Sequence, residues 1–173
     1  MIGTRLPNKR QVCAFTLGDH LFGIDVNYIQ EVFRFQECTP LPLTPPFVKG
    51  LLNLRGKIVL AIGLRERLGM AERPGGKSPT SIVVQIDDGA LCFLVDELFD
   101  IMSLDSADFE TIPKTLSATE KKFVSGCYKL EDRLLILLDT VGVADIAKSL
   151  GLALEESQAR SKYRETITVS ELA

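Results

Sequence analysis

The stretch FVKGLLNLRGKIVLAI, residues 47–62, recurs in outline as FVSGCYKLEDRLLILL, residues 123–138. The two stretches begin 76 positions apart, and Phe, Val, Gly and Leu occupy the same relative positions in both. Each stretch reads as an apolar strand, a polar turn and a second apolar strand, which is the pattern of a β-hairpin. A divergent internal duplication is the simplest explanation.

A second pair of hairpins lies upstream of these two. Residues 12–17 and 21–24 flank the turn Gly18-Asp19, and residues 82–86 and 90–95 flank an Asp-Asp-Gly turn. Glycine supports such turns because it adopts positive φ without a steric cost. These hairpins match at an offset of 69 residues, which pairs Val26 with Val95, Ile29 with Leu98 and Val32 with Ile101.

The sequence therefore predicts an all-β fold with short helices, built from two related halves. Each half has about five short strands, which are enough for a small barrel but marginal as an independent unit, so two barrels should pack together. We expect the first barrel at about 20–71 and the second at about 80–139, joined by a Pro/Gly-rich linker at 72–79. An N-terminal strand and a helix at 140–150 should pack across both, and residues 151–173 read as a charged tail.

Composition excludes several classes of protein. The chain has 173 residues, with 20 Lys and Arg against 23 Asp and Glu, which gives a net charge of −3. Such a surface has no general attraction for nucleic acid or anionic lipid. The longest aliphatic run, Leu134 to Leu138, is far shorter than the ~20 residues that cross a bilayer. The first ten residues lack the apolar middle of a secretory signal. We expect a cytoplasmic protein that does not insert into a membrane.

The residues that usually carry chemistry are scarce. There is one histidine, His20, and four widely spaced cysteines, Cys13, Cys38, Cys92 and Cys127. No spacing matches a metal or redox motif. Cys13 and Cys92 alternate with apolar neighbours, so we expect both to pack in the core. The carboxylates are scattered rather than convergent, so the sequence predicts neither an enzyme nor a bound cofactor or metal.

The duplication separates residues needed for folding from candidates for function. Gly50 persists as Gly126, which indicates a backbone that needs glycine. By contrast, Arg55 corresponds to Glu131, so folding alone does not dictate an arginine at the hairpin tip. A planar guanidinium there suits a carboxylate or carbonyl on another chain. The alternative interpretation is a solvated surface charge.

Residues 24–33 are a further candidate surface. Their apolar alternation changes phase between Val26 and Ile29, which indicates a bulge or bend. Some of these side chains should fill the first barrel, and others could line an exposed groove where another protein docks. The alternative is that all of them pack in the core or between the barrels. The following segment, residues 39–46, has four prolines and reads as a stiff connector, or alternatively as a proline-rich ligand for another domain.

Together these residues resemble the CheW-type coupling domain. The similarity covers about residues 11–150 and includes Phe15-Thr16-Leu17-Gly18 and Phe22-Gly23-Ile24-Asp25-Val26. Its most characteristic part is Thr39-Pro40-Leu41-Pro42 followed by the G-x-x-N-L-R-G run that starts at Gly50. The resemblance implies two five-stranded SH3-like barrels, no catalysis and no cofactor.

The resemblance also implies partners and site residues. Proteins of this family bridge the tips of chemoreceptors to the histidine kinase CheA, whose regulatory domain has the same fold. They work in the cytoplasm and are recruited to membrane-associated receptor arrays. A groove between the barrels would take the receptor helical hairpin, and one barrel end would dock the kinase. Matching by motif assigns Ile29, Val32, Gly50 and Arg55 to the receptor side, and Val26 and Glu31 to the kinase side.

The sequence departs from the family pattern at one position, and two alternative functions remain open. Gly63 stands where the family usually has aspartate, so this strand end should be capped differently. The pathway could be one of pilus or surface motility rather than swimming. A small β-barrel that binds nucleic acid is the distant alternative, although such a protein needs basic and aromatic residues together.

Overall fold

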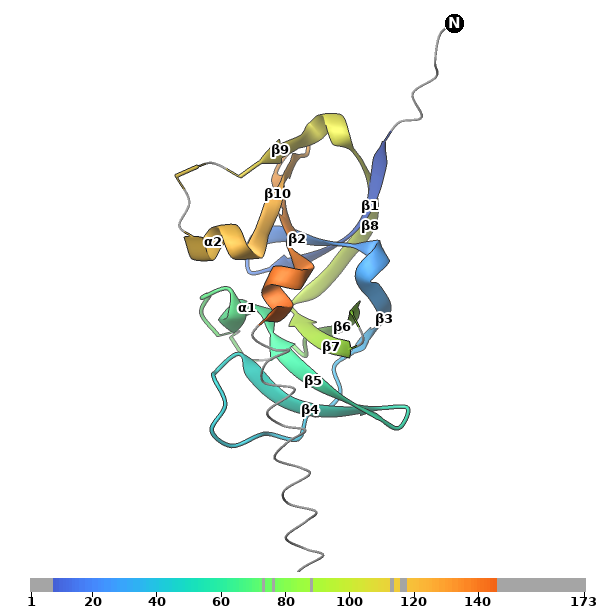
Figure 1. Ribbon diagram of the computed structural model, residues 1–173, viewed down its shortest axis with the longest axis vertical. Coiled ribbons are helices and arrows are strands. Elements are labelled where there is room, and N and C mark those ends of the chain that lie inside the picture. The colour runs from blue at the N-terminus through green and yellow to red at the C-terminus, as the bar shows by residue number, and fades with distance from the viewer. Residues whose placement is uncertain are drawn as a thin grey trace, which may run out of the picture.

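The computed structural model describes residues 8–145, except 73, 76, 88, 113, 116 and 117. In that part of the chain, strands dominate and the helices are short, so the predicted all-β class is confirmed (Figure 1). The strands are β1 (Lys9–Leu17), β2 (His20–Asp25), β3 (Ile29–Arg34), β4 (Val48–Leu54), β5 (Lys57–Gly63), β6 (Thr80–Ile86), β7 (Gly89–Val95), β8 (Glu97–Asp105), β9 (Phe109–Thr111), β10 (Val124–Lys129) and β11 (Leu134–Leu138).

Helical turns connect these strands. They are η1 (Val26–Tyr28), α1 (Leu64–Arg67), η2 (Ser106–Asp108) and α2 (Ala118–Phe123), and a further helix is described over residues 140–145. The rest of the helix predicted at 140–150, and the whole predicted tail at 151–173, lie outside the described residues.

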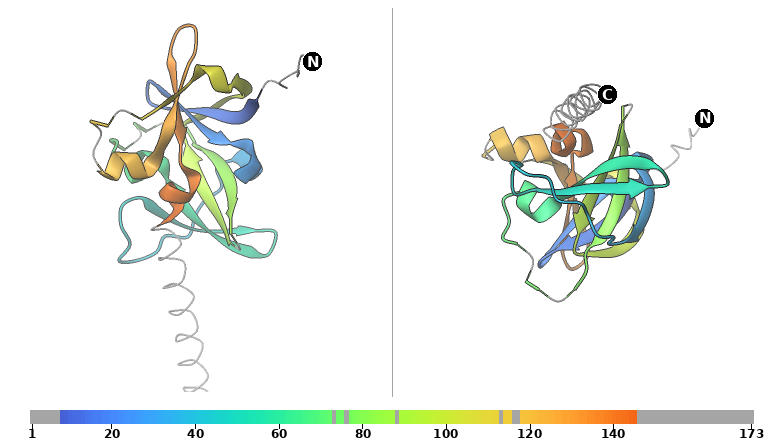
Figure 2. Two further views of the ribbon diagram at one scale, coloured as in Figure 1. Left: turned by 45° about the horizontal axis from the view of Figure 1, so that its top comes forward. Right: turned by 90° about the horizontal axis from the view of Figure 1, so that it is seen from below.

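The strands form two sheets. One has five strands in the order β3-β6-β7-β5-β4, and the other has six in the order β8-β1-β2-β11-β10-β9. The sixth strand, which the sequence did not predict, is the three-residue β9 beside β10. The equivalent hairpins β4–β5 and β10–β11 lie toward opposite ends of the molecule (Figure 2).

Equivalent hairpins of the internal repeat have the same strand-pairing register. In the hairpin β4–β5, Val48 pairs with Ile62 and Gly50 with Ala61. In β10–β11, the residues 76 positions later pair in the same way: Val124 with Leu138 and Gly126 with Leu137. Both hairpins have a β-bulge between their first two pairs. The duplication inferred from sequence therefore corresponds to a structural repeat.

The division of the chain between the barrels differs from the prediction. The five-stranded sheet takes β6 and β7 from the second copy, and the six-stranded sheet takes β1 and β2 from the first. The first hairpin of each copy therefore lies in the sheet of the other copy. The predicted barrel boundaries, 20–71 and 80–139, do not match the sheets. Parallel pairing joins these hairpins to the other copy: β5 pairs with β7 and β11 pairs with β2, at equivalent registers.

Three apolar clusters explain why the strands read as continuous apolar runs. One fills the five-stranded barrel and includes Leu52, Ala61 and Cys92. One fills the six-stranded barrel and includes Val12, Tyr128 and Leu135. The largest lies between the barrels and draws from both sheets: Cys13, Phe15, Leu17, Phe22, Ile24, Val48, Leu60, Ile62, Leu64, Ile82, Val84, Leu91, Phe93, Val95, Phe123, Leu138, Val143 and Ala144. Alternate residues of one strand therefore face two different cores, and both faces are buried.

Polar clamps tie the two barrels together beside this shared core. The Asp96 carboxylate accepts hydrogen bonds from Arg65 Nε of α1 at 2.8 Å and from the Gly18 N–H of the β1–β2 turn at 2.8 Å. Arg67 of α1 is buried, and its Nε donates to the Val143 carbonyl at 2.9 Å. Its guanidinium lies 4.4 Å from the centroid of the Phe123 ring. Arg67 and Val143 are themselves equivalent positions of the repeat, so the clamp joins the corresponding helices of the two copies.

The exchange of hairpins predicts that the barrels unfold together. Cys13 lies on β1 of one sheet and Cys92 on β7 of the other, and both are buried. Burial raises the pKa of the Cys13 thiol and raises the pKa of Cys92 to about 12, so both stay protonated and unreactive in the folded protein at pH 8. We expect both thiols to become reactive at the same urea concentration. The measurement is thiol labelling with mass-spectrometric readout in a background with Cys38 and Cys127 changed to serine. Labelling of one thiol at a clearly lower urea concentration than the other would contradict joint unfolding.

Gly50 is the position where glycine is most clearly required. Its φ is +142°, and a Cβ built there would lie against the carbonyl of Thr39. We expect Gly50→Ala to lower the free energy of unfolding by about 1–3 kcal/mol, because the backbone would be strained and the Thr39 contact displaced. Gly75→Ala is the matched control, since a Cβ there meets open space; it should change stability by less than about 0.5 kcal/mol. Urea denaturation compares the two, and equal stabilities would contradict this role for Gly50.

Candidate functional site

Arg55 lies at the tip of the β4–β5 hairpin in a strained backbone conformation. Leu54 pairs with Lys57, which leaves Arg55 and Gly56 as a two-residue turn, with φ values of +51° and +85°. Positive φ at both positions is typical of a type I′ turn. The Asn53 side chain stabilises the turn by accepting a hydrogen bond from the Gly56 N–H at 3.0 Å. The Arg55 side chain is 87% exposed, as the sequence predicted for a hairpin tip.

An ion pair joins Arg55 to Glu31. The distance from Arg55 Nη2 to Glu31 Oε2 is 3.4 Å. Glu31 lies on β3 and Arg55 follows β4, and these strands are the two edges of the five-stranded sheet. The contact therefore exists because the sheet curls until its edges meet. An exposed pair of this kind contributes little to stability, so the guanidinium is accessible to a carboxylate from a partner.

The apolar candidates are divided between the core and the surface. Val26 in η1 and Ile29 at the start of β3 are partly buried and pack against the core between the barrels. Val32 is 39% exposed. The β3–β6 register shifts between Ile29 and Glu31, which is a bulge close to the predicted change of phase. Val26 and Ile29 thus belong mainly to the packing between the barrels, whereas the Val32 side chain is apolar and exposed; a docking groove beside it stays a prediction.

The structure brings together two residues that the resemblance assigned to different partners. Arg55 was expected on the receptor side and Glu31 on the kinase side, yet they form one ion pair. Gly50 is buried in the middle of β4, so it acts through the backbone rather than as a contact. In the described ranges no group of three metal-ligating side chains occurs. No helix within those ranges is both long enough and apolar enough to cross a bilayer.

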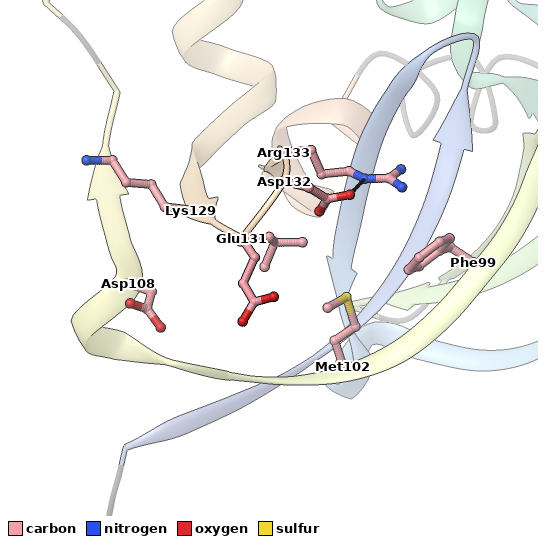
Figure 3. Close-up of a pocket in the computed structure, with 8 residues that line it drawn as sticks. Phe99, Met102, Asp108, Lys129, Glu131, Asp132 and Arg133 are labelled. Carbon is pink, nitrogen blue, oxygen red and sulfur yellow. Dashed lines mark ion pairs between the residues drawn. The ribbon is translucent and has the colours of Figure 1, made fainter.

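A pocket at the mouth of the six-stranded barrel was not anticipated. It has a volume of about 410 Å³ and lies between β8, η2 and the β10–β11 turn (Figure 3). Phe99 and Met102 form one side, the Glu131 side chain points from the β10–β11 turn toward β8, and Asp132 pairs with Arg133. Its charges are of both signs and no group of acid, base and nucleophile converges there.

The departure at Gly63 has a structural explanation. Lys49 Nζ lies 2.7 Å from Glu66 Oε1, and a Cβ at Gly63 would collide with the Glu66 carboxylate. In the second copy the equivalent residue is Asp139, whose carboxylate accepts from the Gly142 N–H at 2.9 Å. At the first strand end, an ion pair between β4 and α1 therefore takes the place of an aspartate cap.

Comparisons with known proteins agree with this architecture. A family model described as the CheW-like domain matches residues 11–148. The chain is 30% identical to the chemotaxis protein CheW of Klebsiella aerogenes over 147 residues, which cover 85% of this chain and 87% of that protein. It is 27% identical over 122 residues to Protein PilI of Pseudomonas aeruginosa, covering 70% of this chain and 68% of that protein.

A solved structure is also similar. The crystal structure of the scaffolding protein TtCheW from Thermoanaerobacter tengcongensis matches with a TM-score of 0.69 and 30% identity, over 76% of this chain and 89% of that one. The resemblance deduced from the Gly50–Gly56 motif is thereby confirmed. The chain belongs to the CheW-like domain family, whose members are non-catalytic scaffolding proteins.

Proposed function

We propose that this protein is an adaptor that couples the cytoplasmic tips of chemoreceptors (methyl-accepting chemotaxis proteins) to the histidine kinase CheA. The proposal includes a location in the cytoplasm at membrane-associated receptor arrays. Membership of the CheW-like family supports the adaptor role, and the Arg55 turn supports the choice of site.

Arg55 is the observation that carries the site assignment. The first central position of a type I′ turn favours Asn, Asp or Gly, because a larger residue strains the backbone at positive φ. Arginine is nevertheless present, with its side chain in solvent and one weak ion pair to Glu31. Neither turn formation nor core packing explains it. A guanidinium held outward can bind a carboxylate of another protein with two parallel hydrogen bonds.

We assign the receptor side to Ile29, Val32, Gly50 and Arg55, and the kinase side to Val26 and Glu31; of these, Gly50 acts through the backbone, and Val26 and Ile29 contribute only the parts of their side chains that the core leaves exposed. Exposed Val32 supplies apolar contact, which stabilises binding by about 25 cal/mol for each Å² removed from water before association costs. Arg55 adds orientation and specificity at the rim. A receptor carboxylate that engages Arg55 competes with Glu31, so receptor binding changes the charge available to the kinase.

The rigid core suits a protein that works without chemistry. Both barrels contribute to one apolar cluster, and the clamps at Asp96 and Arg67 join them. The described part of the chain should therefore act as one unit that holds two partners in fixed relative geometry. A pathway of pilus or surface motility is the second candidate, which the similarity to Protein PilI favours.

Reversal of the Arg55 charge tests the proposal. We expect Arg55→Glu to keep the folded structure, because the side chain is exposed, and to lower receptor-dependent CheA autophosphorylation by about tenfold or more, which corresponds to about 1.4 kcal/mol of coupling. The measurement uses purified receptor, kinase and adaptor reconstituted in membranes. Lys57→Glu is the matched control, since it makes the same charge change two residues away on an exposed position of the same hairpin.

The double variant Glu31→Arg with Arg55→Glu separates two explanations. It restores an internal ion pair but not the guanidinium at position 55, so we expect coupling to stay low. Full recovery of coupling would mean that only the internal pair matters. Normal coupling by Arg55→Glu alone would refute the site. Capture of a labelled oligonucleotide at moderate salt without capture of CheA would favour the nucleic-acid alternative instead.

A further inference from the structure

The loop between β3 and β4 is held firmly at several points. At its start, Thr39 and Leu51 exchange two backbone hydrogen bonds of 2.9 Å. Within it, the Thr44 hydroxyl donates to the Leu41 carbonyl at 3.2 Å, and Leu41 packs against the core between the barrels. At its end, the Val48 N–H donates to the Pro45 carbonyl at 3.0 Å. Its prolines restrict the backbone further, so the loop keeps one shape.

Leu43 stands at the apex of this loop. Its relative exposure is 104%, the highest of the large apolar residues in the described chain, and its φ is +59°. A proline at the second position of a turn and positive φ at the third match a type II turn, in which the third position favours glycine or asparagine. A leucine there strains the backbone and places its whole side chain in water.

The fold explains neither the strained backbone of Leu43 nor the exposure of its side chain. A glycine or asparagine would relieve the strain, and a polar residue would be better hydrated. An exposed leucine alone is ordinary, but one held in a left-handed conformation on a pinned loop is not. Because the loop is already ordered, a partner that buries Leu43 loses little conformational entropy.

We propose that Leu43 is an apolar anchor that inserts into a hole on the helical surface of the receptor tip, an inference that rests on the proposed function. The loop is continuous with the receptor side, since the Thr39 carbonyl lies against Gly50 and the loop leads directly into β4. Arg55 lies at the other end of β4 (Figure 1). A strand of seven residues is about 23 Å long, which is the length of a helix of about 15 residues.

A helical hairpin fits this arrangement better than a compact barrel domain. The surface of a helix offers holes, each formed by four side chains, that accept a single protruding leucine. A straight helix of that length can reach both ends of β4, with the leucine in a hole and the guanidinium at a carboxylate. Leu43 is thus a second contact for the receptor, independent of charge.

The experiment measures stability and binding on the same variants. The probe is a purified helical-hairpin fragment from the cytoplasmic tip of a chemoreceptor encoded in the same genome, with binding followed by calorimetry. We expect Leu43→Asn to weaken binding about tenfold or more while the melting temperature stays constant or rises by about 2–4 °C, because asparagine relieves the strain. A residue with a purely structural role would not lose binding while stability is kept. Leu43→Met should keep most of the affinity.

Leu134→Asn is the matched control, because Leu134 is an exposed leucine, 54% accessible, on the other barrel. It should leave receptor binding unchanged. If the wild type binds and Leu43→Asn binds equally well, the anchor is refuted and the proposed function stands. If the wild type binds no receptor fragment, the proposed function fails and the anchor with it. Weakened binding to the CheA regulatory domain alone would refute a receptor contact at Leu43.

Discussion

The parallel pairing of β5 with β7 and of β11 with β2 is the constraint on which the structure depends. Each pair joins a strand of one copy of the repeat to a strand of the other, at equivalent registers. The borrowed hairpins then bury both faces, one in a barrel and one in the core between barrels. Neither copy can complete a barrel by itself, so the chain folds as one body although its sequence divides into two halves.

Local features of this fold were predictable, and its long-range connections were not. The turn at Gly18, the need for glycine at Gly50 and the burial of Cys92 follow from glycine chemistry and apolar alternation over a few residues. The exchange of hairpins leaves no trace in such patterns, because a strand buried on both faces reads the same whichever barrel holds it. The same limit applies to the site. The turn of Arg55 was visible in sequence, whereas its ion pair with Glu31 needs the sheet to close.

The two copies diverge where a duplicated fold can tolerate it. At equivalent strand ends, Asp139 caps the following helix, while Gly63 makes room for the ion pair of Lys49 and Glu66. Both solutions satisfy the same need with different chemistry. The helices that follow have also become complementary, because Arg67 of the first donates to the Val143 carbonyl of the second. Divergence has therefore added a polar contact between the copies beside a shared core that is apolar.

The hairpin tips show why divergence is useful to a scaffold. The first tip is a two-residue turn with Arg55, whereas the second spans the four residues between the pair Lys129 and Leu134 and carries Glu131 and Asp132. A symmetric dimer-like molecule with identical ends would offer one partner two equal sites, and two different partners would compete for both. Ends that differ in length and in charge discriminate, because a surface complementary to the Arg55 guanidinium meets Glu131 and the Asp132–Arg133 pair at the other tip. A rigid body with two unlike ends therefore presents the Arg55–Glu31 site at one end only, so a partner that recognises the guanidinium binds in one orientation.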